Sequence, residues 1–175
     1  KHQLSQTIPE KLALVYEKKS DWNKAAKEYL TLANNQDDPE LAREGHWRVA
    51  ELYMKANNKK QAIASFKHYV WTYPSPYLLA QEGRNHLINL YLETGDTTKS
   101  MFWRQKIVQF YDKHKDENNT RTSFLAAENK YILSEPLFND YKKIKLKLPF
   151  VPCRISLALR PKSLTKFPKQ APVST

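Results

Sequence analysis

The sequence predicts an all-α fold built from helical hairpins in series. An aromatic residue, an alanine and a second aromatic residue recur 37 positions further along the chain: Tyr16, Ala25 and Tyr29 are followed by Tyr53, Ala62 and Phe66. Self-similarity at such a period is typical of repeat arrays, in which one unit cannot bury its apolar face alone. The 175 residues include only three glycines and many aromatic residues, a composition that favours packed helices over sheets with tight turns.

The first hairpin is predicted from Pro9 to about Ala33. Proline is tolerated at the first position of a helix, so we expect Pro9 to open the first helix, with Ala13 and Tyr16 on its apolar face. Asp21 is a good N-cap for the second helix, which continues through Ala25 and its neighbours.

The second hairpin shows the clearest signals. Asp38 is expected to cap its first helix and Pro39 to open it. The polar residues 57–59 form the predicted turn, and the second helix is expected to end before Pro74.

The third hairpin repeats this arrangement. Ser75 and Pro76 are expected to act as cap and first helical residue, and Gly95 with Asp96 makes the turn. The repeat pattern is weaker here, because Ser100 occupies the position that an alanine holds in the first two hairpins.

The fourth unit is expected to be irregular. It begins after a polar break at 118–120, and Pro136 is predicted to end or kink its helix because an interior proline removes a backbone hydrogen bond. The unit is therefore either a bent helix or a distorted hairpin. The predicted repeat domain spans 8–148, in units of about 8–36, 39–74, 76–117 and 120–148, and 149–175 form a basic tail divided by prolines.

These residues resemble the tetratricopeptide repeat (TPR). The second unit carries most of the resemblance, through Ala50, Tyr53, Asn57, Ala62, Phe66 and Pro74. The third unit departs from the motif at Arg104, where the aromatic residue of the second helix belongs. The spacing of 37 to 38 residues also exceeds the usual ~34. The resemblance implies a right-handed α-solenoid of about 3.5 to 4 hairpins.

A fainter likeness concerns residues 124–146, which look like the segment after the repeats in large cell-envelope TPR proteins of gliding and predatory bacteria. It implies a piece of a longer or processed chain. The compartment stays open, with periplasm or cell envelope favoured over cytoplasm.

TPR proteins bind partners on a concave groove lined by the first helix of each hairpin. The frame of the motif places seven residues in this groove: Glu44, Trp47, Glu51, Lys55, Asn85, Asn89 and Glu93. Trp47 is either an anchor for a partner or a packing residue against the next unit. Asn85 and Asn89 lie one turn apart, where they can bond the backbone of an extended peptide. Trp47 and Glu51 differ in type from the residues with which some TPR proteins bind the terminal carboxylate of a partner.

The net charge of +11 is concentrated at the C-terminal end. Nine of the 29 basic residues follow Asp140 and none of the 18 acidic ones does, so the first 140 residues have a net charge of only +2. Three interpretations are open: a solvated end, a contact with an acidic partner or anionic membrane surface, and a nucleic-acid contact. The basic residues singled out are Lys142, Lys143, Lys145, Lys147, Arg154, Arg160 and Lys162.

No catalytic or metal site is predicted, and no cofactor. There is no phosphate-binding loop and no nucleophile elbow, and Cys153 has no second thiol. The acidic clusters at 37–40 and 116–117 are interpreted as helix caps and solvated ends. No two of the five histidines share a helical face as zinc ligands would: His2, His46, His68, His86 and His114.

The sequence therefore predicts a scaffold without enzymatic activity that binds a peptide or partner helix in its groove. Its terminal edges are expected to stack on further repeats or on another subunit. The alternative is a basic helical module that binds nucleic acid or an anionic membrane surface through residues 142–169.

Overall fold

A computed structural model describes the backbone of residues 2–145 and the side chains of residues 8–145. This part of the chain is all-α, as predicted, and contains no strand. Its helices are α1 (His2–Lys18), α2 (Trp22–Asn34), α3 (Pro39–Lys55), α4 (Lys59–Thr72), α5 (Tyr77–Glu93), α6 (Thr97–Lys113), the short 3₁₀ helix η1 (Lys115–Glu117) and α7 (Thr120–Lys143).

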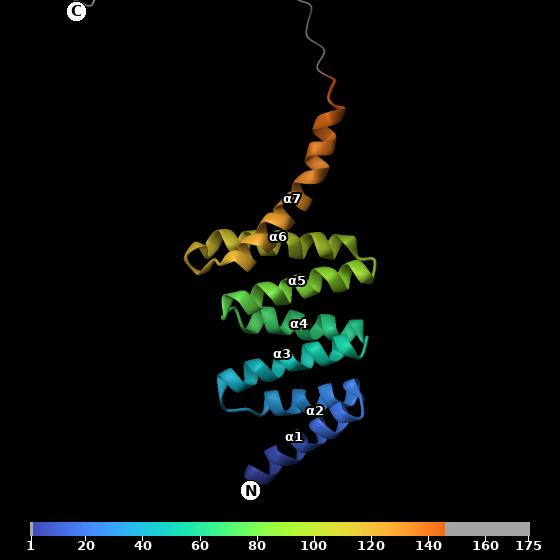
Figure 1. Cartoon of the computed structure of the whole chain (residues 1–175), viewed down its shortest axis with the longest axis vertical. Helices are drawn as coiled ribbons and strands as arrows, with labels where there is room; N and C mark the ends of the chain where they lie inside the picture. Colours follow the sequence, from blue (N-terminus) through green and yellow to red (C-terminus); the bar gives the residue numbers. More distant parts are fainter. Residues whose placement is uncertain (1, 146–175) are drawn as a thin grey trace, which may run out of the picture.

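The helices α1 to α6 run back and forth in a stack, and α7 begins on the stack and then extends away from it (Figure 1). Each helix packs chiefly on its neighbours in the sequence, and α5 also contacts α7. This arrangement of adjacent helices is repeat-like. The handedness of the stack and the number of true repeats stay predictions.

The three hairpins turn in the same way. The first helix of each ends in paired backbone hydrogen bonds that satisfy its last carbonyl groups, an arrangement known as a Schellman motif. The outer bonds run from Asp21 N to Tyr16 O, from Asn58 N to Tyr53 O and from Asp96 N to Tyr91 O, each 2.9 Å long. In each turn the residue before the donor has a positive φ: 58° at Ser20, 52° at Asn57 and 77° at Gly95.

The donor residue of each turn also caps the next helix. The side chains of Asp21, Asn58 and Asp96 accept hydrogen bonds from the backbone N–H groups of Lys24, Gln61 and Lys99. One short polar sequence thus ends one helix and begins the other, which explains why these turns were predictable from local residues.

We expect Gly95→Ala to lower the free energy of unfolding by about 1 kcal/mol, because a Cβ disfavours a positive φ. Ser20→Gly is expected to raise it by up to about 1 kcal/mol for the same reason. A Cβ at Gly95 would meet no atom within 4 Å, so the change isolates the backbone effect. Urea titrations of both variants measure it, and equal stability of Gly95→Ala and wild type would contradict the assigned turn.

The recurring small residues form the centre of the stack. Ala25 and Ala62 are fully buried, and Ser100 at the equivalent position of the third hairpin is 2% exposed. Of the second-helix residues, Phe66 is fully buried whereas Tyr29 is only partly buried. The aromatic residue of the second helix is therefore buried more deeply in the second hairpin than in the first.

Two sequence-based expectations about prolines are wrong, and for Pro136 one of the two alternatives is excluded. Pro9 does not open the first helix, because α1 begins at His2 and contains it. Ser75 is not a cap: Pro76 occupies the N-cap position without a side-chain hydrogen bond, and α5 begins at Tyr77. Pro136 lies inside the single helix α7, so a distorted hairpin is excluded for residues 120–143. A proline has no backbone N–H to donate to the helix. Pro136 lies on an exposed part of α7, where water can bond the carbonyl that is left without a donor.

Candidate partner-binding face

The first helices of the hairpins, α1, α3 and α5, together with α7, form what we call the first-helix row. Two ion pairs join neighbouring helices of this row. The Arg48 guanidinium of α3 donates to Glu17 of α1, with Nη2 2.8 Å from Oε2. The Arg121 guanidinium of α7 donates to both carboxylate oxygens of Glu82 on α5. These pairs are partly exposed, so each stabilises the row by about 1 kcal/mol or less.

All seven predicted groove residues lie on this row, on α3 and α5. Glu44, Lys55, Asn89 and Glu93 are exposed. Three others are partly buried: Trp47, Glu51 and Asn85. Glu93 also pairs with Lys59 of α4 at 3.1 Å, which leaves the other three exposed side chains as the more accessible part of the predicted groove.

Trp47 packs inside the stack. Its ring contacts Tyr69 of α4 edge-on, with ring centroids 4.9 Å apart, and reaches Phe66 and His86. Its indole Nε1 donates a 2.9 Å hydrogen bond to Glu51 Oε1. Of the two interpretations of Trp47, the structure therefore supports the packing role, and an anchoring role for the ring stays a prediction.

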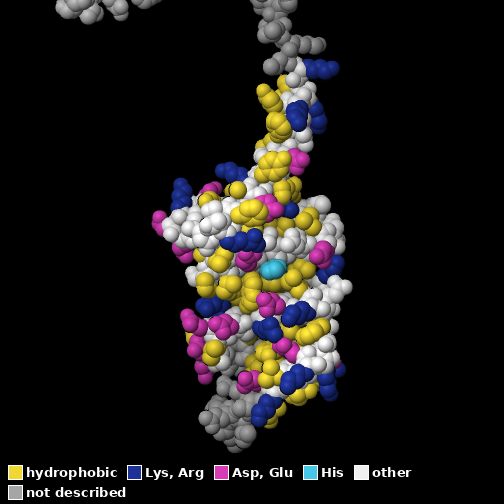
Figure 2. Space-filling model, in the orientation of Figure 1, with side chains coloured by type: hydrophobic (Ala, Val, Ile, Leu, Met, Phe, Trp, Pro, Cys, Tyr) yellow, Lys and Arg dark blue, Asp and Glu magenta, His cyan; other side chains and the backbone are white. Residues whose placement is uncertain are grey.

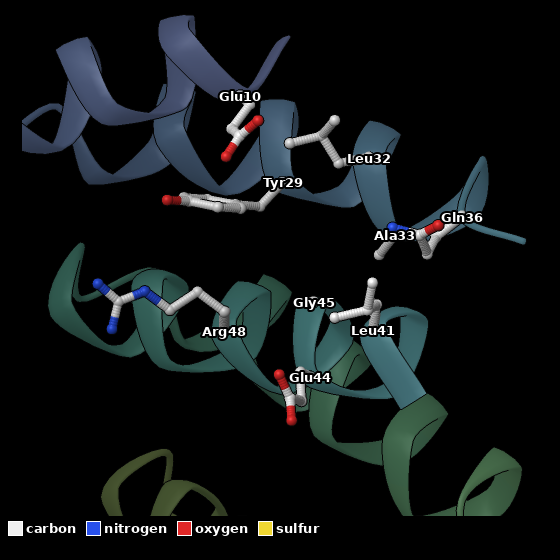
Figure 3. A pocket seen from close by; sticks show the side chains of 9 residues that line it. All are labelled: Glu10, Tyr29, Leu32, Ala33, Gln36, Leu41, Glu44, Gly45 and Arg48. Atoms are coloured by element: carbon white, nitrogen blue, oxygen red, sulfur yellow. The ribbon is translucent and has the colours of Figure 1, made fainter. Parts of the chain in front are cut away.

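A cavity of about 490 Å³ opens on the first-helix row between α1, α2 and α3. In the close view, the Tyr29 ring and the Glu10 carboxylate lie on one side of the space, and Arg48 and Glu44 lie on the other (Figure 3). Carboxylates, a phenol, a guanidinium and apolar side chains thus meet at one opening. The lining residues are Glu10, Tyr29, Leu32, Ala33, Gln36, Leu41, Glu44, Gly45 and Arg48.

Gly45 allows the close approach of α2 and α3 below this cavity. A Cβ at Gly45 would lie 2.8 Å from the Cβ of Ala33, closer than two side chains can pack. Burial and the nearby Glu17 carboxylate raise the pKa of Tyr29, so its phenol is a neutral donor or acceptor at pH 7. Only Glu44 of the cavity was a predicted groove residue. Arg48 and Tyr29 were missed because their meeting depends on how two hairpins stack.

Two histidines are brought together that the sequence keeps apart. The rings of His46 on α3 and His68 on α4 have centroids 4.8 Å apart. The spacing rule missed them because they belong to different helices. Among the side chains that the structure describes, those of residues 8–145, no three of His, Cys, Asp or Glu gather in a way that would hold a metal ion. Cys153 lies outside the described residues.

Burial lowers the pKa of His46 and of His86, and the neighbouring His68 lowers that of His46 further. Around His86, the carboxylates of Glu82 and Glu51 act in the opposite sense and Arg121 in the same sense. Both imidazoles are thus neutral in the folded chain at pH 7.

We expect the free energy of unfolding to fall as the pH drops from 7 to 5.5. Unfolded histidines bind protons near pH 6.5, whereas folded His46 and His86 bind them only at lower pH, so protons favour the unfolded chain. The slope is at most about 1.4 kcal/mol per pH unit for each histidine. The carboxyl groups with a lowered pKa, Asp21 and Asp96, lose their contribution only near or below pH 4.

Urea titrations at pH 7.5, 6.5 and 5.5 measure this dependence. The double variant His46→Gln, His86→Gln is expected to show a flatter profile than wild type. An identical slope in the two proteins would show that other groups take up the protons.

The surface carries both signs of charge. In Figure 2, Lys and Arg side chains are interspersed with Asp and Glu over the stack, and hydrophobic and basic side chains gather on the protruding part of α7. That part exposes a stripe made of Leu137, Phe138, Tyr141 and Ile144. Lys142 Nζ lies 4.4 Å from the Phe138 ring centroid, and Lys143 pairs with Asp140 at 2.9 Å.

The other predicted basic residues have different outcomes. Lys145 follows α7 and is exposed. Lys147, Arg154, Arg160 and Lys162 lie outside the described residues. Cationic side chains at the end of α7 are favourably placed, because the C-terminal end of a helix carries partial negative charge.

The acidic clusters behave as predicted caps and ends. Asp38 Oδ1 accepts a 2.8 Å hydrogen bond from the Glu40 backbone N–H at the start of α3. Glu117 in η1 contacts His114 Nδ1 at 3.1 Å.

No protein-family model matches the chain, and no curated protein or solved structure matches it significantly. The resemblance to the TPR family thus rests on the residues quoted above. None of the described helices combines the length and the hydropathy needed to cross a bilayer.

Proposed function

We propose that this chain is a TPR-like scaffold without catalytic activity that binds a peptide or a partner helix on its first-helix row. The observation that carries the proposal is the open cavity between α1, α2 and α3, which shares Glu44 of α3 with the predicted groove. Exposed Glu44 lines this cavity, and exposed Lys55 and Asn89 continue the row along α3 and α5. Such polar side chains on rigid helices suit the recognition of a peptide backbone and its charged groups.

The exposed stripe on α7 supports stacking at the end of the array. Leu137 is 73% exposed and Tyr141 67% exposed, although both are large apolar side chains. A repeat unit normally buries such a stripe on the next unit. We therefore include stacking on further repeats or a second subunit in the proposal.

Affinity capture with matched variants tests the binding face. Glu44→Lys reverses a charge at the cavity and Asn89→Ala removes an exposed amide, and both positions are exposed enough to leave the fold intact. Lys67→Ala on α4 is the control, since Lys67 is exposed on the other row of helices. Proteins that bind the face are expected to be captured by wild type and the control but reduced at least ten-fold in both variants. Equal capture by all four proteins would refute the proposed face.

The basic C-terminal residues support a second candidate function, in which residues 142–169 bind nucleic acid or an anionic membrane surface. Deletion of residues 150–175 separates the two. Capture that survives deletion at both low and moderate salt favours the first-helix row, and capture lost on deletion favours the basic segment.

A further inference from the structure

A second cavity, of about 260 Å³, opens between α4, α5 and α6, on the row formed by the second helices of the hairpins. Its chemistry differs from that of the first-helix row, because its lining contains three cationic side chains and no carboxylate. The cations are Arg84, Lys106 and Lys113, and the remaining lining residues are Val70, Trp71, Pro74, Trp103, Gln109 and Phe110.

Arg84 of α5 is buried in this cavity without a partner. The residue is 7% exposed, and within the described part of the chain its guanidinium has no hydrogen bond and no ion pair. Its Nη1 is fully buried and unpaired. Burial lowers the pKa of Arg84 to about 10, so the group is still a cation at pH 7. An unpaired buried charge is costly, and it is rarely kept unless something compensates it.

Other arginines of the stack show how this chain satisfies such groups. Arg48 and Arg121 bind carboxylates, and Arg104 binds the amide oxygen of Asn129. The guanidinium of Arg84 instead lies over the face of the Phe110 ring, with its carbon 3.8 Å from the ring centroid. A cation–π contact of this kind holds the guanidinium flat and leaves its N–H donors free for a ligand.

The walls of the cavity are aromatic. Trp71 of α4 and Trp103 of α6 lie against each other with ring centroids 6.1 Å apart and ring planes tilted by 58°. Trp71 is 64% exposed, whereas Trp103 is 4% exposed. An exposed tryptophan beside a buried, unpaired arginine is unexpected for surface that only contacts water. The cavity lies slightly below the range of about 300 to 1,000 Å³ for ligand sites, so it suits a compact molecule or one side chain.

We propose that this cavity binds a carboxylate carried on a flat apolar body, with Arg84 holding the carboxylate and the exposed Trp71 ring packing against the body. A planar guanidinium matches a carboxylate in two parallel hydrogen bonds, and Lys106 and Lys113 add positive charge at the opening. The apolar walls disfavour a strongly hydrated dianion such as phosphate. Apart from Arg84, which comes from α5, the site is built from α4, α6 and the residues that follow α4, and it does not depend on the proposed function.

Phenylacetate is a suitable probe, with phenylacetamide as its neutral counterpart and inorganic phosphate as a plain oxyanion. Binding is followed by the NMR signals of the indole N–H groups of Trp71 and Trp103, assigned with Trp71→Phe and Trp103→Phe. We expect phenylacetate to shift these signals in a saturable way, with an affinity at least ten-fold above that of phenylacetamide. Phosphate is expected to have little effect.

Arg84→Met tests the role of the guanidinium, and Lys27→Gln on α2 is a control for loss of a distant positive charge. The first variant is expected to bind phenylacetate at least ten-fold more weakly and to be as stable as wild type or more so, because it removes an unpaired buried charge. The control is expected to bind as wild type does. A merely structural Arg84 would instead lower stability when replaced.

Four results would overturn the proposal: no saturable shift with wild type, equal shifts by the acid and the amide, binding of phosphate alone, or unchanged affinity in Arg84→Met. If Arg84→Met does not fold, the surface variant Lys106→Gln, Lys113→Gln replaces it. It is expected to weaken phenylacetate binding at least three-fold, and unchanged affinity would equally refute the site.

Discussion

Phe66→Ala is expected to lower the free energy of unfolding by about 3 to 5 kcal/mol, a large share of the 5 to 15 kcal/mol typical of a domain. Phe66 is fully buried on α4, at the centre of the second hairpin. Its ring meets Trp47 of α3 edge-on at 5.5 Å and stacks on His86 of α5 at 4.8 Å. The substitution therefore removes contacts with both neighbouring helices and leaves a cavity between two hairpins.

Equilibrium urea unfolding measures the loss, and two variants serve as controls. Phe66→Leu largely conserves volume and is expected to cost less than about 1.5 kcal/mol. Tyr29→Ala changes the equivalent residue of the first hairpin, which is only partly buried, so it is expected to cost clearly less than Phe66→Ala. If the two alanine variants lose equal stability, the deeper burial of Phe66 does not decide how much each aromatic residue contributes.

The turns and caps could be predicted because they depend on neighbouring residues. Asp21 caps α2 and Asp38 with Pro39 begins α3, as expected, and Asp96 lies in the predicted turn, where it also caps α6. A side-chain oxygen reaches an N–H two or three residues ahead whatever the rest of the fold does. The recurring residues Ala25, Ala62 and Phe66 are likewise fully buried, whereas Phe124 and Tyr131 of α7 are exposed.

The prolines were less informative, because a proline excludes one hydrogen bond rather than a whole helix. Pro9 and Pro136 both lie inside helices. Sequence rules treat an interior proline as a stop, but the cost falls where the freed carbonyl can meet water.

The candidate sites were predictable only in part. The motif placed Glu44 and Asn89 on an accessible row, but the frame could not show that Trp47 is held by Tyr69 and by Glu51. Pairs such as Glu17 with Arg48 join residues 31 positions apart and depend on how the hairpins stack. A sequence also does not show that Arg84 lacks a partner, because this depends on which side chains the fold brings close to the guanidinium.

Asn129→Ala is expected to lower the free energy of unfolding by about 3 kcal/mol, although it removes only a small side chain. Asn129 of α7 is fully buried, and its Oδ1 accepts a 2.7 Å hydrogen bond from Arg104 Nη1 of α6. Its Nδ2 donates at 2.7 Å to the Leu125 carbonyl. The alanine variant leaves a partly buried guanidinium without its acceptor, which costs more than the hydrogen bond itself contributes. Urea unfolding measures the change.

A double-mutant cycle shows whether this pair replaces the aromatic packing of the repeat. Arg104 occupies the position of Phe66 and Tyr29, and α6 meets α7 there through a hydrogen bond instead of a ring. Arg104→Met and Asn129→Leu each leave one polar partner unsatisfied and are expected to cost about 1 to 3 kcal/mol. Together they present two apolar side chains of similar volume, so the double variant is expected to regain most of the loss, with a coupling above about 1 kcal/mol. Additive losses would mean that the two residues act independently. The hydrogen bond at Arg104 would then not be a replacement for the aromatic packing of the other repeats.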